Sequence, residues 1–217
     1  MTDNPTFVRP NPAAGKRGDA AYADHWGKSH EAVSDPLGYR AGYIDILALD
    51  AMLPEGYRLL DVGCGTAGYH RLLTRHGHVH GIDFMPEMIE QAEKFKRDFD
   101  IRNAQYTCTA FEDFENASGY DAVRIPGVYG WYRPWHGQQK VLKTIGALLN
   151  PSGIAVLSYV PPMTAVMMAK TILAPQRTVV ICRRRFERMV RHAGMTALFD
   201  IKFPHVTVMF ARKDAAG

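Results

Sequence analysis

The sequence predicts an α/β protein with a doubly wound, mostly parallel sheet, and three features of the chain support this fold class. An apolar run ending at Asp61 leads into a glycine-rich turn at 63–68 and then into helix-compatible residues, which is typical of a strand, a tight turn and a helix. A second strand ends at Asp83. The stretch 154–159 is apolar at nearly every position, as expected of a central parallel strand that helices cover on both faces. These features predict strands that alternate with helices within one domain.

The glycine-rich turn and the acidic residue after it predict a nucleoside-binding site. Glycine lets the backbone lie against a ligand without a Cβ in the way, and the following helix presents unpaired N–H groups. Asp83 lies twenty positions after Gly63, at the end of the next strand, where its two oxygens could bind the two hydroxyls of a ribose. Gly63, Gly65 and Gly68 also satisfy the G-x-G-x-x-G pattern of dinucleotide-binding proteins. Asp61 favours a different ligand, because it can meet an ammonium group but would repel a pyrophosphate.

Four stretches resemble the class I S-adenosylmethionine (SAM)-dependent methyltransferases, of the type that acts on small molecules. Residues 59–68, LLDVGCGTAG, resemble motif I of that family, and 79–88, VHGIDFMPEM, resemble its following acidic motif. Residues 148–153, LLNPSG, resemble the turn before the family's fifth strand, and 196–213 resemble its terminal hairpin. The resemblance covers about 57–213. It implies SAM as cofactor, S-adenosylhomocysteine (SAH) as product, and a seven-stranded, mostly parallel sheet with a C-terminal antiparallel hairpin and an N-terminal helical cover.

Length and composition predict a single domain. The 217 residues and the hydrophobic content of 47% are enough to bury a sizeable core. Residues 1–19 contain three prolines and two glycines with little periodic apolar content, so we expect a disordered N-terminal segment. Helices are expected at 21–33 and 37–52, and helices in this place often cover the substrate in methyltransferases. The predicted methyltransferase domain spans 20–217, with a helical cover at 20–55 and a SAM-binding core at 56–217.

The other elements follow in order along the core. Pro86 is suited to the first turn of a helix, and Pro204 allows only a short connection between the last two strands. The expected elements are helices at 86–97, 138–149 and 183–192, strands at 104–108, 120–125 and 154–159, and a hairpin of 196–203 and 205–212. The helix at 183–192 carries five arginines, which indicate either a solvated face or a surface that contacts phosphate or an anionic substrate.

Charge, cysteines and apolar runs limit the partners that we expect. No apolar run reaches the roughly 18 to 20 residues that span a bilayer, and the N-terminus does not resemble a secretory signal. The three cysteines have no metal-ligand or redox spacing, and the alternating His76, His78 and His80 lack a Cys or carboxylate partner at ligand spacing, so we expect no metal. The net charge of +4 is modest for a nucleic-acid binder. We therefore expect a cytoplasmic monomer or homodimer, without membrane or nucleic-acid partners, that acts on a small molecule.

The resemblance assigns cofactor contacts to the loops after the first three strands. Phe84 or Met85 stands where the family places an apolar residue against the adenine. Many relatives have an acidic residue where this chain has Thr109 or Ala110, so either Glu112 or a backbone group would hold the exocyclic amine. An N-terminal aromatic segment closes over the methionine end of SAM in the family; simple aromatic packing is the alternative here. The predicted cofactor-binding residues are Asp61, Gly63, Cys64, Gly65, Gly68, Asp83, Phe84, Met85, Ala110, Phe111 and Tyr22.

The aromatic stretch 126–136, directly after the fourth strand, is the predicted substrate-binding region. Ligands of open parallel sheets bind beyond the C-terminal strand ends, near the switch in strand order. Relatives that methylate exocyclic amides or nucleobase amines carry Asn or Asp, Pro, Pro and an aromatic residue at 125–129, and this chain does not, which disfavours a DNA or glutamine target. The predicted substrate-binding residues are Tyr129, Trp131, Trp26, Met163 and Met167. Packing of the loop and core filling by the methionines are the alternatives.

Catalysis requires a base for an acceptor that must lose a proton. His136 is the first candidate, His25 the second, and Tyr132 could orient the acceptor through its hydroxyl; His136 could instead cap its helix. The predicted function is transfer of a methyl group from SAM to an oxygen or nitrogen of a small, aromatic or apolar molecule. The alternatives are an RNA-modifying methyltransferase, a SAM-binding regulatory protein without turnover, and a dinucleotide oxidoreductase.

Overall fold

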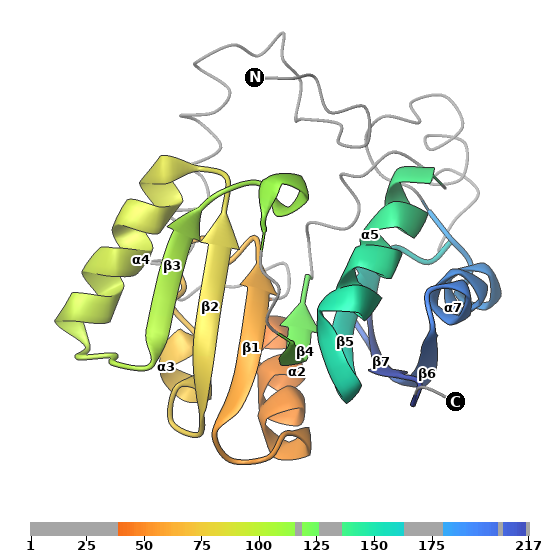
Figure 1. Ribbon diagram of the computed structural model, residues 1–217, viewed down its shortest axis with the longest axis horizontal. Helices are drawn as coiled ribbons and strands as arrows, with labels where there is room; N and C mark the ends of the chain where they lie inside the picture. Colours follow the sequence, from red (N-terminus) through yellow and green to blue (C-terminus); the bar gives the residue numbers. More distant parts are fainter. Residues whose placement is uncertain (1–38, 116–118, 126–135, 163–179, 204–205, 216–217) are drawn as a thin grey trace, which may run out of the picture.

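The computed structural model describes residues 39–115, 119–125, 136–162, 180–203 and 206–215 (Figure 1). Seven strands of this part of the chain form one sheet with the order β3-β2-β1-β4-β5-β7-β6. The strands are β1 (Tyr57–Val62), β2 (Gly77–Asp83), β3 (Ala104–Cys108), β4 (Tyr120–Arg124), β5 (Leu149–Tyr159), β6 (Met195–Lys202) and β7 (Thr207–Lys213). β1 to β5 pair in parallel, whereas β7 runs antiparallel to both β5 and β6. The predicted fold class, with its C-terminal antiparallel pair, is confirmed.

In the described part of the chain, one helix precedes β1, and the others lie between the strands along the chain. They are α2 (Tyr39–Met52), α3 (His70–Leu73), α4 (Pro86–Asp98), α5 (His136–Leu148) and α7 (Arg183–His192), with a short 3-10 helix, η2 (Phe111–Asp113). α4 begins with proline at its first position, and its buried residues Met88 and Ala92 lie four positions apart on one face. The helix predicted at 21–33 lies outside the described residues.

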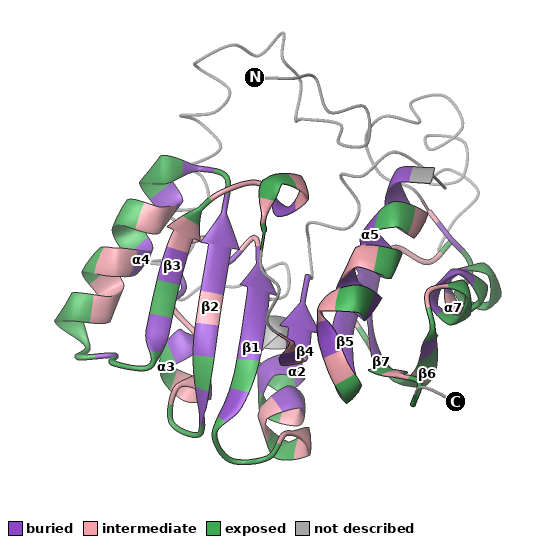
Figure 2. Ribbon diagram, in the orientation of Figure 1, coloured by how far each residue is buried: buried purple, intermediate pink, exposed green. Residues whose placement is uncertain are grey.

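The helices pack on the two faces of the sheet around separate apolar clusters. On one face, Val141 and Ile145 of α5 and Phe186 of α7 pack among residues of β1, β4 and β5. On the other face, Ile46 of α2 and Leu73 of α3 pack against side chains on the opposite side of the same three strands. Figure 2 shows the strands mostly buried and the outward sides of the helices exposed. This burial on both faces explains why residues 154–159 of β5 are apolar at nearly every position.

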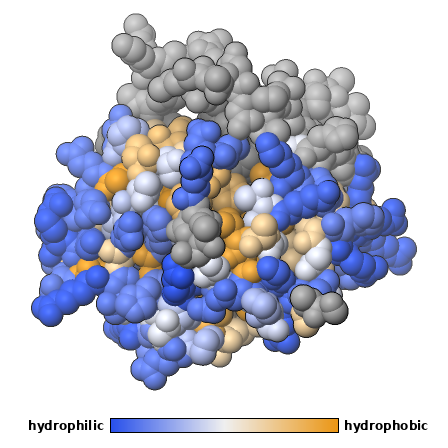
Figure 3. Space-filling model, viewed as in Figure 1, coloured by the Kyte–Doolittle hydropathy of each residue, from blue (hydrophilic) through white to orange (hydrophobic). Residues whose placement is uncertain are grey.

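Hydrophilic and hydrophobic residues are distributed unevenly over the surface of the molecule. On the face of the molecule drawn in Figure 3, hydrophilic residues dominate the left and right sides, and hydrophobic residues gather in the middle. Among the residues that the structure describes, no helix is long and apolar enough to cross a membrane.

The order of the strands reverses at β1. The connection after β1 leads to β2 on one side of β1, and the connection after β3 leads back to β4 on its other side. In this topology, ligands bind in the crevice at the C-terminal ends of the strands beside the reversal. The register places Asp61 of β1 level with Gly81 of β2 and with Arg124 of β4. The fold therefore brings the glycine turn, the end of β2 and the end of β4 to one edge of the sheet.

Candidate functional site

The turn between β1 and α3 has the backbone conformation that its glycines predict. Gly63 and Gly65 have φ angles of 72° and 55°, in the left-handed region that favours glycine. A Cβ added at Gly65 or Gly68 would meet no atom of the described residues within 4 Å, so these two positions face open space in the described part of the chain. Ala67 also has a positive φ, 58°, although its methyl group is buried. The turn is thus bent sharply, and part of its backbone is accessible to a ligand.

Asp83 is fixed beside this turn by two backbone N–H groups. Gly65 N donates to Asp83 Oδ2, and Met85 N donates to Asp83 Oδ1, each over 3.0 Å. The side chain is largely buried, and burial raises the pKa of the carboxyl group, while bonds from the Met85, Gly65 and Phe84 N–H groups oppose that rise. A carboxylate offers about four lone-pair sites. Asp83 therefore keeps at least one acceptor site for a ribose hydroxyl.

Asp61 lies fully buried at the end of β1 and accepts three side-chain hydrogen bonds. Arg124 Nη1 donates to its Oδ1 over 3.1 Å. At its Oδ2, His70 Nε2 lies at 2.9 Å and the Tyr69 hydroxyl donates as well. Burial alone would raise the pKa of Asp61, but the charge of Arg124 and the bonds from His70 and Tyr69 hold it below its usual value. Asp61 is therefore a carboxylate anion held in one orientation.

Arg124 joins Asp61 to a second buried carboxylate. Its Nε and Nη2 donate to Asp45 Oδ2 of α2 over 3.3 and 3.2 Å, and its guanidinium lies 4.7 Å from the ring centroid of Tyr69. Burial raises the pKa of Asp45 even though Arg124 opposes the shift. Asp45 Oδ1 has no hydrogen-bond partner among the residues that the structure describes. The cluster offers no net positive charge to a ligand, because one guanidinium faces two carboxyl groups.

We refer to these side chains as the buried polar cluster. Its members are Asp45, Asp61, Tyr69, His70, Tyr106 and Arg124, where Tyr106 contributes a hydroxyl 3.1 Å from His70 Nδ1. Only Asp61 was predicted from the sequence. One feature of the sequence could have indicated the other members: Arg124 ends the otherwise largely apolar strand β4, level with Asp61 at the end of β1. An arginine in a buried strand needs a buried partner of opposite charge.

The predicted adenine contacts occupy the loops after β2 and β3. Phe84 is 44% exposed next to Asp83, whereas Met85 and Phe111 are buried. Thr109 N donates to the Asp83 carbonyl oxygen over 2.9 Å and so ties the two loops together. Ala110 follows in this loop and is partly exposed. These positions border the glycine turn, but their contact with an adenine ring stays a prediction.

Several predicted residues lie outside the described residues. They are the cofactor residue Tyr22, the substrate residues Trp26, Tyr129, Trp131, Met163 and Met167, the catalytic candidates His25 and Tyr132, and the side chain of His136. The backbone of His136 begins α5, the helix that follows β4 in the chain.

Of the three alternating histidines, His76 and His80 lie within hydrogen-bond distance of other side chains and His78 lies at the surface. His76 Nδ1 lies 2.9 Å from Asp50 Oδ2, and His80 lies within hydrogen-bond distance of the Tyr120 and Thr107 hydroxyls. His78 is exposed. Within the described ranges, no group of three or more His, Cys, Asp or Glu residues has the arrangement of a metal site.

A comparison with protein families finds a match over the part of the chain that contains the glycine turn. Residues 59–153 match a family model described as a methyltransferase domain. This segment begins in β1 and includes the glycine turn, Asp83 and Arg124. The segment is therefore similar to a methyltransferase domain, and the arrangement of the strands is the one predicted for the class I methyltransferase fold.

Individual relatives match only parts of their own length. An uncharacterized protein of Rickettsia prowazekii (strain Madrid E) is 32% identical over 110 residues, which cover 48% of this chain and 43% of that protein. A malonyl-[acyl-carrier protein] O-methyltransferase of Acetivibrio thermocellus is 30% identical over 120 residues, which cover 54% of this chain and 40% of that protein. The matches thus span less than half the length of these curated relatives.

Solved structures share the fold at low identity. Magnesium protoporphyrin IX methyltransferase from Synechocystis PCC 6803 with bound SAM gives a TM-score of 0.71 at 15% identity, covering 90% of this chain and 93% of that chain. The N-methyltransferase NodS from Bradyrhizobium japonicum WM9 gives 0.65 at 15% identity, covering 83% and 98%. At these identities the similarity shows that the chains share a fold.

Proposed function

We propose that the protein transfers a methyl group from SAM to an oxygen or nitrogen of a small, aromatic or apolar molecule. The observation that supports this most directly is the position of Asp83. Its carboxylate is fixed by Gly65 N and Met85 N beside a turn whose backbone is open at Gly65 and Gly68. This arrangement suits a nucleoside whose ribose hydroxyls donate to the carboxylate.

The residues of the site fit SAM better than a dinucleotide. Asp83 would hold the ribose, and the exposed Phe84 ring lies next to it as a surface for the adenine. The buried polar cluster beneath the turn contains two carboxyl groups and one guanidinium, so it offers a pyrophosphate no net attraction. Asp61 instead favours a positively charged ligand group. When bound, SAM supplies the methyl group as an electrophile on a positively charged sulfur.

The proposal also specifies the base that deprotonates the methyl acceptor and the type of acceptor atom. His136 begins the helix that follows β4, at the end of the sheet where ligands of this fold bind, and we propose it as the base that takes the acceptor's proton. His25 is the second candidate, with Tyr132 as the orienting hydroxyl. Similar chains include one named as an O-methyltransferase and one named as an N-methyltransferase, so the fold serves both kinds of acceptor.

The cofactor assignment is tested by titration calorimetry. Asp83→Asn should weaken SAM and SAH binding by about 10- to 100-fold, because hydrogen bonds to a charged group contribute roughly 1.5–3 kcal/mol. Asp98→Asn is the matched control, since Asp98 is an exposed carboxylate at the end of α4. Normal SAM affinity of Asp83→Asn would contradict the ribose placement, and binding of NAD or NADP in place of SAM would contradict the proposed cofactor.

The reaction is tested by product mass with labelled SAM and a panel of phenols, amines and carboxylates. A gain of one methyl group identifies the acceptor class. His136→Ala should then lower turnover by roughly 10²- to 10⁴-fold while the Kd of SAM stays unchanged. Full turnover of His136→Ala across pH would show that this histidine is not the base.

A further inference from the structure

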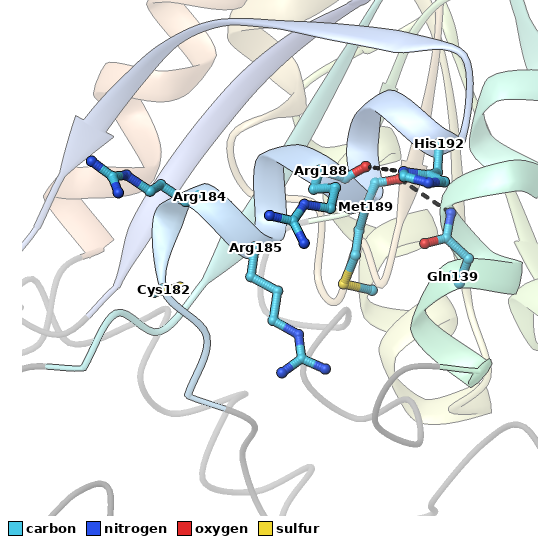
Figure 4. A pocket seen from close by; sticks show the side chains of 7 residues that line it. All are labelled: Gln139, Cys182, Arg184, Arg185, Arg188, Met189 and His192. Atoms are coloured by element: carbon cyan, nitrogen blue, oxygen red, sulfur yellow. Dashed lines mark hydrogen bonds between the residues drawn. The ribbon is translucent and has the colours of Figure 1, made fainter.

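A basic cavity lies along α7, beside the first turn of α5 (Figure 4). Its volume is about 610 Å³, which is within the range of small-molecule sites, about 300–1,000 Å³. Arg184, Arg185, Arg188 and His192 of α7 and Gln139 of α5 are among the residues that line it. We refer to it as the α7 cavity.

The charged side chains among the described residues that line the α7 cavity are basic. No Asp or Glu is among the described residues that line it. The acidic residue of α7, Glu187, pairs with Arg183 over 2.8 Å and with Arg191 over 3.5 Å, and Asp200 also pairs with Arg183, over 2.7 Å. Glu187 and Asp200 thus pair with Arg183 and Arg191, which do not line the cavity. In the part of the chain that the structure describes, neither Arg184 nor Arg188 has a carboxylate within ion-pair distance.

The arginines of the first turn of α7 stand where a helix disfavours cations. The N-terminal end of a helix has a partial positive charge, which stabilises acidic side chains and destabilises basic ones. α7 has no acidic residue in its first turn and begins Arg183-Arg184-Arg185. Arg183 is compensated by Asp200 and Glu187, but Arg184 has no such partner among the described residues. A sequence that breaks a local rule in this way is typical of a binding site, because a bound anion would remove the cost.

The helix that presents these arginines is held firmly. Phe186, Met189 and Val190 form its buried apolar face within the core that α5 shares. Gln139 Nε2 donates to the Met189 carbonyl oxygen over 3.1 Å and links the first turn of α5 to α7. Figure 4 shows the Arg185 and Arg188 side chains extending from the same helix on the side of the cavity. The arrangement provides guanidinium groups on a fixed support, as recognition of an oxyanion requires.

One residue that lines the α7 cavity belongs to the first turn of α5, the helix that begins at His136. Gln139 follows His136 by three positions in α5, so the two residues lie on the same side of the helix, about 4.5 Å apart along its axis. A molecule with one end in the cavity could therefore reach the end of α5 that carries His136.

We propose that the α7 cavity binds an oxyanion, a carboxylate or phosphate group, carried by the methyl acceptor. This inference rests on the proposed function and adds to it a class of acceptor: a molecule with an anionic group separate from the atom that is methylated. Arg185 and Arg188 hold the oxyanion through charge-assisted hydrogen bonds. The size of the cavity favours a small acceptor over an RNA strand, whose phosphates need an extended basic surface.

The first experiment needs no knowledge of the acceptor. Inorganic phosphate, with sodium chloride at matched ionic strength as reference, should raise the Tm of the wild-type chain. The rise should disappear in Arg185→Gln/Arg188→Gln and persist in Arg191→Gln, whose arginine belongs to the same helix but pairs with Glu187 outside the cavity. An equal rise in all three chains, or none in the wild type, would overturn the proposed site.

The second experiment compares a phenol with the same phenol bearing a carboxylate as acceptors. In Arg185→Gln/Arg188→Gln, kcat/KM for the carboxylate-bearing acceptor should fall about 10- to 100-fold, mainly through KM, because charge-assisted bonds are lost. The neutral phenol should be methylated within twofold of the wild-type rate. Equal losses for both acceptors, or salt-sensitive RNA binding that the double variant abolishes, would refute an acceptor-specific site. Absence of methyl transfer to any acceptor by a wild-type chain that still binds phosphate would instead refute the proposed function.

Discussion

Replacing Arg124 by methionine should destabilise the protein strongly, because the change leaves two buried carboxyl groups without their cation. The exposed fractions of the three side chains are 7% for Arg124, 1% for Asp45 and 0% for Asp61. Methionine has similar length but no charge and no N–H donor. Breaking a buried ion pair by removing one partner costs about 3–5 kcal/mol, whereas exposed pairs contribute about 0–1 kcal/mol. We expect the free energy of unfolding to fall by about 3–5 kcal/mol, a large share of the roughly 5–15 kcal/mol typical of a domain.

The loss should depend on pH. Without Arg124, the folded-state pKa values of Asp45 and Asp61 should rise above those of the unfolded chain. A carboxyl group whose pKa is raised in the folded state stabilises the fold at pH values below its pKa in the unfolded chain, about 3.9. That contribution is lost as the pH rises through the pKa of the group in the folded state. In the wild type, the lowered pKa of Asp61 has the opposite effect, since its contribution is present above about pH 3.9 and is lost as pH falls through the folded pKa. The raised pKa values in the variant make its difference from the wild type larger at pH 7 than at pH 5, whereas the wild-type contribution of Asp61 is already complete at pH 5.

Urea denaturation at the two pH values measures this difference. Arg102→Met is the matched control, because Arg102 forms an exposed pair with Asp100 and its loss should leave the urea midpoint unchanged. The double variant Arg124→Met/Asp45→Asn should recover at least about 1 kcal/mol, since one of the two unpaired charges is then absent. A loss below about 1 kcal/mol for Arg124→Met, or a loss independent of pH, would refute the reasoning.

Three further substitutions test the packing of the site. Gly81→Ala would place a Cβ 2.8 Å from the Tyr106 ring and 2.9 Å from Cys64 Sγ, so urea unfolding should show a loss of about 1–3 kcal/mol. Tyr106→Phe removes the hydroxyl 3.1 Å from His70 Nδ1 and should cost about 1–3 kcal/mol in the same assay, because a buried nitrogen loses its partner; an unchanged midpoint would show that the contact is dispensable. The Cβ of Gly68→Ala meets no atom of the described residues within 4 Å, so the stability should stay within about 0.5 kcal/mol, yet SAM binding in calorimetry should weaken if the turn faces the cofactor.

Local sequence patterns were sufficient for the fold and for the ribose-binding candidate. Glycines that tolerate positive φ, followed by Asp83 at the end of the next apolar run, predict a turn and a carboxylate at neighbouring strand ends, and the structure has both. The pattern was less reliable at the start of β5. Pro151, Ser152 and Gly153 indicate a turn, and Ser152 does have a φ of 62°, but the strand already begins at Leu149 because that residue pairs with Tyr120 of β4 across a shift in register.

The buried polar cluster could not be predicted in the same way, because its members are brought together only by the fold. Arg124 lies 63 positions from Asp61 and 79 from Asp45, and no local spacing relates them. The cluster nevertheless changes what can be said of Asp61, which the sequence suggested only as a partner for an ammonium group. Three of about four acceptor sites on its carboxylate are already used by Arg124, Tyr69 and His70. The predicted ammonium contact would occupy the remaining site, and the same three donors would hold the carboxylate ionised and correctly oriented before the ligand arrives, which lowers the cost of binding.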